Sequence, residues 1–322
     1  MKIKTKKHLA ALLSAFMLGS AMAPASLMAT EATPKQEIIY TNLTSDGEPS
    51  ETYVVNIFDL DKAATIIDYG NYASVRNMTT QDKIDLKDQT VTINAGVGSL
   101  YYEGKLKDAK LPWTFDVEYT LDGTKKEASD LAGDDGALKM SLSIKNGPGD
   151  DAYFNNFALQ VTMALDTDKC KNIKTEGATE AMVGSKKQLV YTIFPGEEKT
   201  ITLTADVTDF EMDAIAINAL PLSDDLATMA AQLKTAQAMQ TALAAGNTAV
   251  LQSAQATATA ATEEAVESVD AAKTTSFVSS KNKVTAVQFV IKTPAIQKEE
   301  RTIEEAPEKE KTFWEKLKTL FE

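Results

Sequence analysis

Apolar and polar residues alternate over most of the first 221 positions of the chain. In TFDVEYTLDG, the side chains of Phe115, Val117 and Tyr119 share one face of an extended strand, and the acids between them share the other. LKMSLSIKNG repeats this pattern, and similar short segments run from EIIYTNLT to KTITLTADV. Turn-forming Gly, Asp and Asn residues separate the segments, as at 45–47. The pattern predicts a mainly β protein with antiparallel β-sandwich-like domains.

The periodicity becomes helical after Pro221, where the chain turns rich in Ala and Gln. Ser223 is a suitable N-cap, and Gly246 marks a stop before a second helix, so we expect an inserted Ala-rich α-helical hairpin, in the manner of a short coiled coil. The β pattern then returns in TSFVSS and KVTAVQFVIKT, which we expect to form a closing strand pair. The helical segment is therefore interpreted as an insertion between two strands of one domain. The residues expected to make contacts through the hairpin are Leu226, Met229, Leu233 and Leu243.

The two ends of the chain differ from its middle. A basic start, an apolar stretch of about 15 residues and small residues after it are typical of a signal peptide, with cleavage after Ala25 or Ala29 both open. At the other end, FWEKLKTLFE predicts an amphipathic helix behind a charged linker. This helix either contacts a membrane or a partner, or packs on its own core, and the sequence leaves both open. Its apolar residues are Phe313, Trp314, Leu317, Leu320 and Phe321.

These patterns divide the chain into six expected segments. They are a signal peptide at 1–29, a first β-rich region at 36–135, a second β-rich domain at 136–221 and 274–294, the helical hairpin at 222–273, a charged linker at 295–312 and the C-terminal helix at 313–322.

The composition argues against most kinds of active site. His8 is the single histidine and lies in the expected signal peptide, so a Ser-His-Asp triad or a His-ligated metal is not expected. Cys170 is the single cysteine, so neither a disulfide nor a CxxC pair can form within the chain. The formal net charge is −13, which disfavours nucleic acid. We therefore expect a non-enzymatic protein with no cofactor and no metal.

Three remaining features could carry chemistry. Short Asp-rich spots lack the spacing of a calcium loop and are interpreted as turns. No two carboxylates are spaced in a way that indicates a glycosidase. Tyr101, Tyr102 and Trp113 are weak candidates for an aromatic platform that binds sugar rings, although aromatic residues in β domains more often belong to the core.

Several phrases also resemble a known family. EIIYTNLTSDGEPSETYVVNIFD, LYYEGKL, LPWTFDVEYTLDG, SDLAGDDGALKMSLSIKN and FVSSKNKVTAVQFVIKTPAI occur in this order. Together they resemble exported Firmicutes proteins related to the extracellular part of the phage-infection-protein-like (Pip/YhgE-like) family, over roughly residues 36–294. The resemblance implies a β-rich exported protein of a Gram-positive bacterium with a helical insertion, and it implies no reaction. The transmembrane helices of larger relatives have no counterpart in this sequence, which ends on FWEKLKTLFE.

The functional expectation is a secreted or cell-envelope-associated structural or interaction protein. Its partner would be a protein or a component of the cell envelope, and the C-terminal helix would add peripheral membrane contact. Two alternatives stay open. One is a wall protein that binds or cleaves carbohydrate, and the other is an accessory subunit of a membrane export or transport complex.

Overall fold

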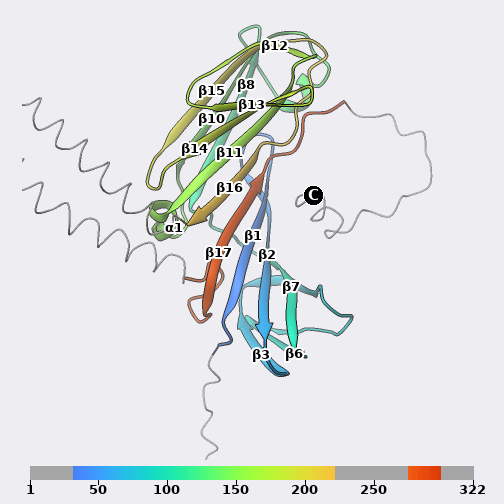
Figure 1. The fold of residues 1–322 in the computed structure, drawn as a ribbon, viewed down its shortest axis with the longest axis vertical. Coiled ribbons are helices and arrows are strands. Elements are labelled where there is room, and N and C mark those ends of the chain that lie inside the picture. The colour runs from blue at the N-terminus through green and yellow to red at the C-terminus, as the bar shows by residue number, and fades with distance from the viewer. Residues whose placement is uncertain (1–31, 222–274, 299–322) are drawn as a thin grey trace, which may run out of the picture.

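The computed structural model describes residues 32–221 and 275–298, which form three β-sheets (Figure 1). The prediction of a mainly β protein with antiparallel sheets is confirmed. The expected hairpin lies outside the described residues. The strands are β1 Lys35–Leu43, β2 Pro49–Leu60, β3 Ala64–Tyr69, β4 Tyr72–Asn77, β5 Asp85–Lys87, β6 Thr90–Ala95, β7 Gly98–Leu106, β8 Trp113–Leu121, β9 Thr124–Lys126, β10 Gly136–Asn146, β11 Phe157–Asp166, β12 Cys170–Thr175, β13 Thr179–Val183, β14 Lys186–Ile193, β15 Lys199–Val207, β16 Ala216–Pro221 and β17 Val284–Lys292.

A nine-stranded sheet runs through both sandwiches of the described residues in the order β13-β14-β11-β16-β17-β1-β2-β7-β4. A five-stranded sheet, β12-β15-β10-β8-β9, covers one part of it and makes the larger sandwich, at the top of Figure 1. A three-stranded sheet, β3-β6-β5, lies at the other end and makes the smaller sandwich. The expected limit at residue 135 falls between β9 and β10, two strands of the same five-stranded sheet.

The larger sandwich has an apolar core that follows from the alternation in its strands. In β10, every second residue from Leu138 to Ile144 is buried, and the same holds for β11 from Phe157 to Leu165. Cys170 lies in this core, 1% exposed, and burial raises the pKa of its thiol to about 11. The cysteine is therefore a buried apolar side chain with an unreactive thiol.

The middle of the nine-stranded sheet joins segments that are far apart in sequence. β1 pairs in parallel with β17 and antiparallel with β2, so the first strand of the described chain lies beside its last. β16 and β17 pair antiparallel from Ala216 opposite Lys292 to Ala219 opposite Phe289. The two strands that flank residues 222–274 are thus neighbours in one sheet.

Two expectations about the end of the chain need correction. TSFVSS, at 275–280, forms bends and turns, because hydrogen bonds from side chains satisfy its backbone where a strand partner would otherwise be needed. The start of the expected linker, at 295–298, packs on the three β-sheets, which together we call the β-body. Ile296 is 6% exposed and forms a β-bridge with Met212, so apolar burial holds these residues in place.

Candidate functional site at the return of the 222–274 segment

Of the three weak candidates for an aromatic platform, Tyr102 and Trp113 lie in the core, which was the preferred interpretation. Tyr102 is fully buried and its hydroxyl donates to the carboxylate of Asp68. Trp113 is 2% exposed, and its ring meets Phe289 edge to face at 5.3 Å. Tyr101 is partly buried. Because it directly precedes Tyr102 in β7, its side chain points to the opposite face of the sheet. No common exposed surface for a sugar ring results.

The other predicted contact residues cannot be placed. Those of the hairpin and of the C-terminal helix lie outside the described residues. What the structure does describe is the point where the chain leaves the sheet before residue 222 and the point where it returns after 274.

The exit and the return lie beside the same short helix. β16 ends at Pro221, which is opposite Phe157 of β11. Phe157 directly follows α1, Asp151–Asn156, whose first turn is capped by Asp150 through a hydrogen bond of 2.9 Å from the Ala152 amide. The hydroxyl of Tyr153 in α1 donates to the carbonyl of Thr275 at 2.6 Å. Residue 221 therefore lies beside the end of α1, and residue 275 is bound by a side chain of α1.

An aromatic cluster packs underneath this junction. The rings of Tyr153, Phe157 and Phe277 all meet Phe289 edge to face, with centroids 5.2 Å, 5.8 Å and 5.2 Å away. Phe277 belongs to residues 275–283, which we call the return segment, and Phe289 belongs to β17. The cluster therefore joins the return segment to the sheet. Burial raises the pKa of Tyr153, so its hydroxyl stays protonated and acts as a donor.

Glu37 of β1 fixes the next residues of the return segment. Its carboxylate accepts from the Ser276 hydroxyl at 2.6 Å and from the Phe277 amide at 2.9 Å. The Ser276 hydroxyl in turn accepts from the amides of Val278 and Ser279, both at 3.2 Å. One buried carboxylate therefore determines the path of four consecutive residues.

Glu37 belongs to a buried charge cluster inside the smaller sandwich. The Lys35 ammonium lies 3.0 Å from the Glu37 carboxylate and 2.8 Å from that of Asp68, and it donates to the side-chain carbonyl of Asn56 at 2.6 Å. Asn56 donates to the Tyr72 hydroxyl at 3.1 Å. The cluster thus links β1, β2, β3 and β4 with the return segment.

The electrostatics of this cluster favour a charged lysine. Burial alone lowers the pKa of Lys35, but Glu37, the Tyr72 hydroxyl and Asp68 outweigh it, and the pKa is raised. An ammonium with 2% exposure keeps its charge only where carboxylates and hydrogen-bond acceptors replace water. Loss of any one member would leave another buried and unpaired.

Asn282 completes the attachment before β17 begins. Its side-chain amide accepts from the Tyr69 amide at 3.0 Å and donates to the Tyr69 carbonyl at 2.7 Å, as a neighbouring strand would. The return segment is therefore bound to α1, to β1 and to β3 before it enters the sheet.

A cleft of about 380 Å³ opens beside the return segment, between the two sandwiches. Its walls combine apolar residues such as Leu106 and Val278 with the charged Asp108, Lys110 and Asp150. Within residues 32–221 and 275–298, no three His, Cys, Asp or Glu side chains are grouped so as to hold a metal ion. Ser276, which also lines the cleft, is 8% exposed, and its hydroxyl is engaged by the Glu37 carboxylate and by the amides of Val278 and Ser279.

Sequence reasoning missed this site, although a signal for it was present. In β1, Lys35 and Glu37 fall on the same side as Ile39, which is the buried side. Two charged residues on the apolar face of a strand predict buried partners. Their partners, Asp68 and Ser276, could not be chosen among many acids and serines without the fold.

Comparisons with known proteins found only solved structures of low similarity. No protein-family model and no curated protein matches the chain. Solved structures with similarity include the Fcho1 mu homology domain of Danio rerio with a bound Eps15 peptide, at 11% identity and a TM-score of 0.35 over 83% of this chain and 97% of that one. A yeast delta-COP-I mu-homology domain shows 9% identity and a TM-score of 0.33, over 57% and 79%. The same yeast domain complexed with a Dsl1 WxWxV peptide gives 8% and 0.34, over 57% and 79%.

No helix in the described part of the chain is long and apolar enough to cross a bilayer.

Proposed function

We propose that this protein is an exported, non-enzymatic interaction protein of the cell envelope, in which the β-body is a scaffold and residues 222–274 supply the contact surface. The observation that supports this proposal is the attachment of that segment. The strands on either side of it pair with each other, and its return is held by the Tyr153 hydroxyl and the Glu37 carboxylate. A segment inserted between two paired neighbouring strands can be exposed to a partner without disturbing the sheet.

The chemistry around the return segment agrees with a positioning role. Glu37 and Lys35 are fully occupied with structural hydrogen bonds and ion pairs, and both are at most 2% exposed. They cannot reach a substrate from that depth. Glu37 instead fixes the point at which the chain returns, through Ser276 and Phe277.

Replacement of residues 222–274 by a short Gly-Ser linker tests the proposal. We expect the variant to keep the β-body's circular dichroism spectrum and cooperative unfolding, because β16 and β17 still pair. In-cell crosslinking and surface proximity labelling should then lose the partners that the full chain captures. Capture of the same partners at the same yield would contradict the proposal.

The envelope location is tested separately by removing residues 312–322, which hold the amphipathic end of the sequence. We expect the full chain to fractionate partly with the envelope and the shortened chain to move to the medium. Equal release of both forms would remove the proposed C-terminal tether and leave the role of 222–274 untouched.

A further inference from the structure

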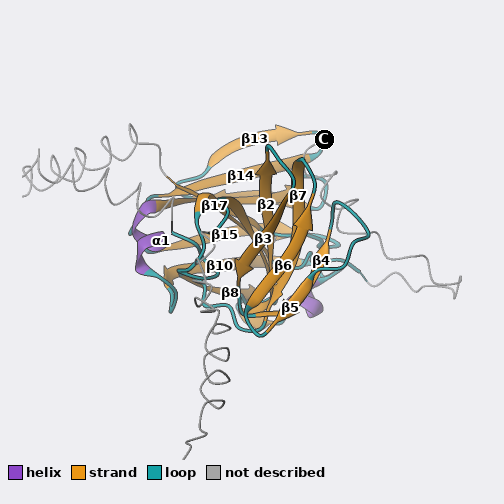
Figure 2. Cartoon of the chain, turned by 90° about the horizontal axis from the view of Figure 1, so that it is seen from below, coloured by secondary structure: helices purple, strands orange, loops and turns teal. Residues whose placement is uncertain are grey.

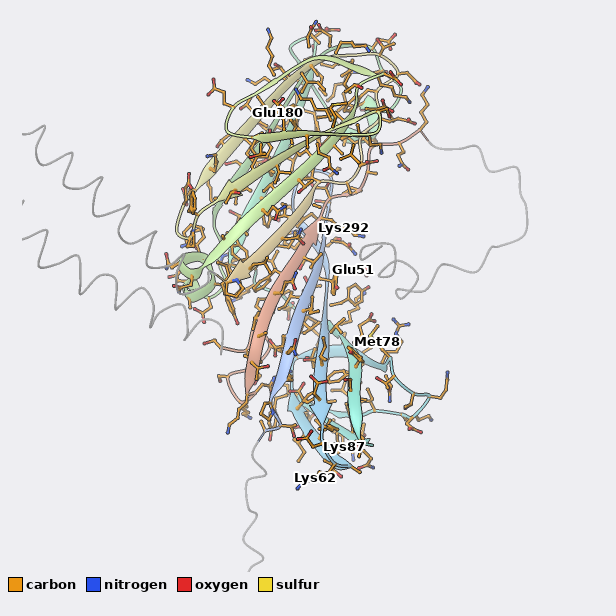
Figure 3. All side chains as sticks on the ribbon, in the orientation of Figure 1. Glu51, Lys62, Met78, Lys87, Glu180 and Lys292 are labelled. Carbon is orange, nitrogen blue, oxygen red and sulfur yellow. The ribbon has the colours of Figure 1, made fainter. Side chains whose placement is uncertain are left out.

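The outer strand of the nine-stranded sheet, β13, differs from the other sheet edges. All five of its residues are exposed, and Met182 and Val183 are 59% and 55% exposed. Figure 2 shows β13 at the outer margin of the sheet, and Figure 3 labels Glu180 on this strand in the larger sandwich. An uncovered, regular edge strand has a row of backbone N–H and C=O groups available for another strand.

The other edges of the three sheets have features that discourage such pairing. β5 and β9 are three residues long. β4 and β12 each have a break in register, and β12 also has two lysines. β3 is covered at Tyr69 by the side chain of Asn282. β13 pairs regularly with β14 over all five residues and has no proline, lysine or bulge.

The β13 sequence is complementary to itself. In an antiparallel pair centred on Ala181, Glu180 lies opposite Met182 of the second copy, and Thr179 lies opposite Val183. This register pairs all five residues and places no like charges opposite each other, whereas a shift centred on Glu180 would oppose two carboxylates. The β-branched Thr and Val form a favourable cross-strand pair.

The local charges also permit two copies to approach despite the acidic composition of the chain. Glu180 forms an ion pair with Lys187 of its own β14 at 2.6 Å, and Lys186 pairs with Asp213 at 2.5 Å. The edge therefore has no unpaired charge of its own, and Met182 on the core-facing side extends the apolar face beyond the sandwich.

We propose that β13 is a self-association edge, at which a second copy of this chain pairs antiparallel about a two-fold axis at Ala181 and joins the two nine-stranded sheets. The contact is short, so the expected assembly is a reversible dimer whose fraction rises with protein concentration. It would bring two copies of the 222–274 segment into one particle, and it does not depend on what that segment binds.

Sedimentation of the full chain over a wide concentration range tests the association. The wild type should rise towards twice the monomer mass, and Met182→Glu, which places a second carboxylate opposite Glu180 of the other copy, should stay monomeric. Val97→Glu is the matched control, because Val97 is 73% exposed in a loop away from β13 and likewise exchanges an exposed apolar side chain for a carboxylate. A wild type that stays monomeric throughout, or equal effects of both substitutions, would overturn the proposal.

Single cysteines test the register. Residues opposite each other in an antiparallel pair have Cα atoms about 4.5–5.5 Å apart, which a disulfide can bridge. Ala181→Cys should therefore give a disulfide dimer under mild oxidation. Thr179→Cys, on the same face of the same strand, should not, since its copies would lie about 13 Å apart along the strands. Cys170 is buried and does not compete. Equal crosslinking at 179 and 181 would contradict the register.

Discussion

The two sandwiches share one sheet but have different interiors. The larger one is filled by apolar side chains such as Met140, Leu142 and Val161, each with no exposed surface. The smaller one contains all three buried charged side chains of the described residues, Lys35, Glu37 and Asp68. An apolar core tolerates many volume-conserving exchanges, whereas a buried charge cluster is stable only when complete. The return segment is bound by Glu37, a member of the buried charge cluster, and therefore depends on the interior that tolerates substitution less well.

The strongest test of this comparison is removal of the central ammonium. Lys35→Met leaves Glu37 and Asp68 facing each other without a counter-charge, so we expect a loss of about 3–5 kcal/mol in the free energy of unfolding. Urea titration measures it. Lys105→Met, which breaks the exposed pair with Glu51, is the matched control and should change stability little. Similar effects of the two substitutions would mean that the buried cluster contributes no more than a surface pair.

Truncation in the apolar core should cost a comparable amount by another mechanism. Leu142→Ala in β10 leaves a cavity between the two large sheets, and we expect a loss of about 2–5 kcal/mol. Leu142→Met keeps the volume and should lose less than about 1.5 kcal/mol. The analogous near-isosteric exchange Glu37→Gln should be more harmful than Leu142→Met, and the reverse order would refute the contrast between the two interiors.

Alkaline pH should affect the two interiors differently. The pKa of Lys35 in the folded protein is raised above 10.5, so its stabilisation is complete below the unfolded value. This stabilisation is lost as the pH rises from the pKa of the unfolded lysine through the higher pKa of the folded one. We expect the stability gap between the wild type and Lys35→Met to be constant up to about pH 10 and to narrow above it, by no more than about 1.4 kcal/mol per pH unit. A gap that widens at high pH would show the opposite sign of linkage.

The smallest expected effect is local to the junction. Tyr153→Phe removes only the hydrogen bond to the Thr275 carbonyl, which is worth about 0.5–1.5 kcal/mol. Amide exchange over residues 275–279 should become faster, while the strands of the larger sandwich keep their protection. Tyr53→Phe, whose hydroxyl bonds the exposed Glu51, is the control and should leave the junction unchanged. Uniform loss of protection would mean that the hydroxyl supports the whole fold.

The alternation of residues was sufficient to predict the strands but not their neighbours. The pattern put Val117 of β8 and Leu142 of β10 on the apolar face of each strand, and both residues are buried. It could not show that β1 lies beside β17, because that parallel pairing joins residues about 250 positions apart. For Trp113 and Tyr102 the sequence favoured the core but left a sugar-binding platform open, and packing decided for the core by burying both.

By itself, the sequence determined the β class, the solitary Cys170 and the position at which the strand pattern stops after Pro221. These follow from local periodicity and residue identity, which need no knowledge of distant contacts. Only the tertiary structure decided that Glu37 meets Ser276, that Lys35 lies between two carboxylates, and that β13 is an edge with no further neighbour among the described strands. Each of these features depends on which strands become neighbours. That pairing is determined by burial and hydrogen bonding over the whole chain.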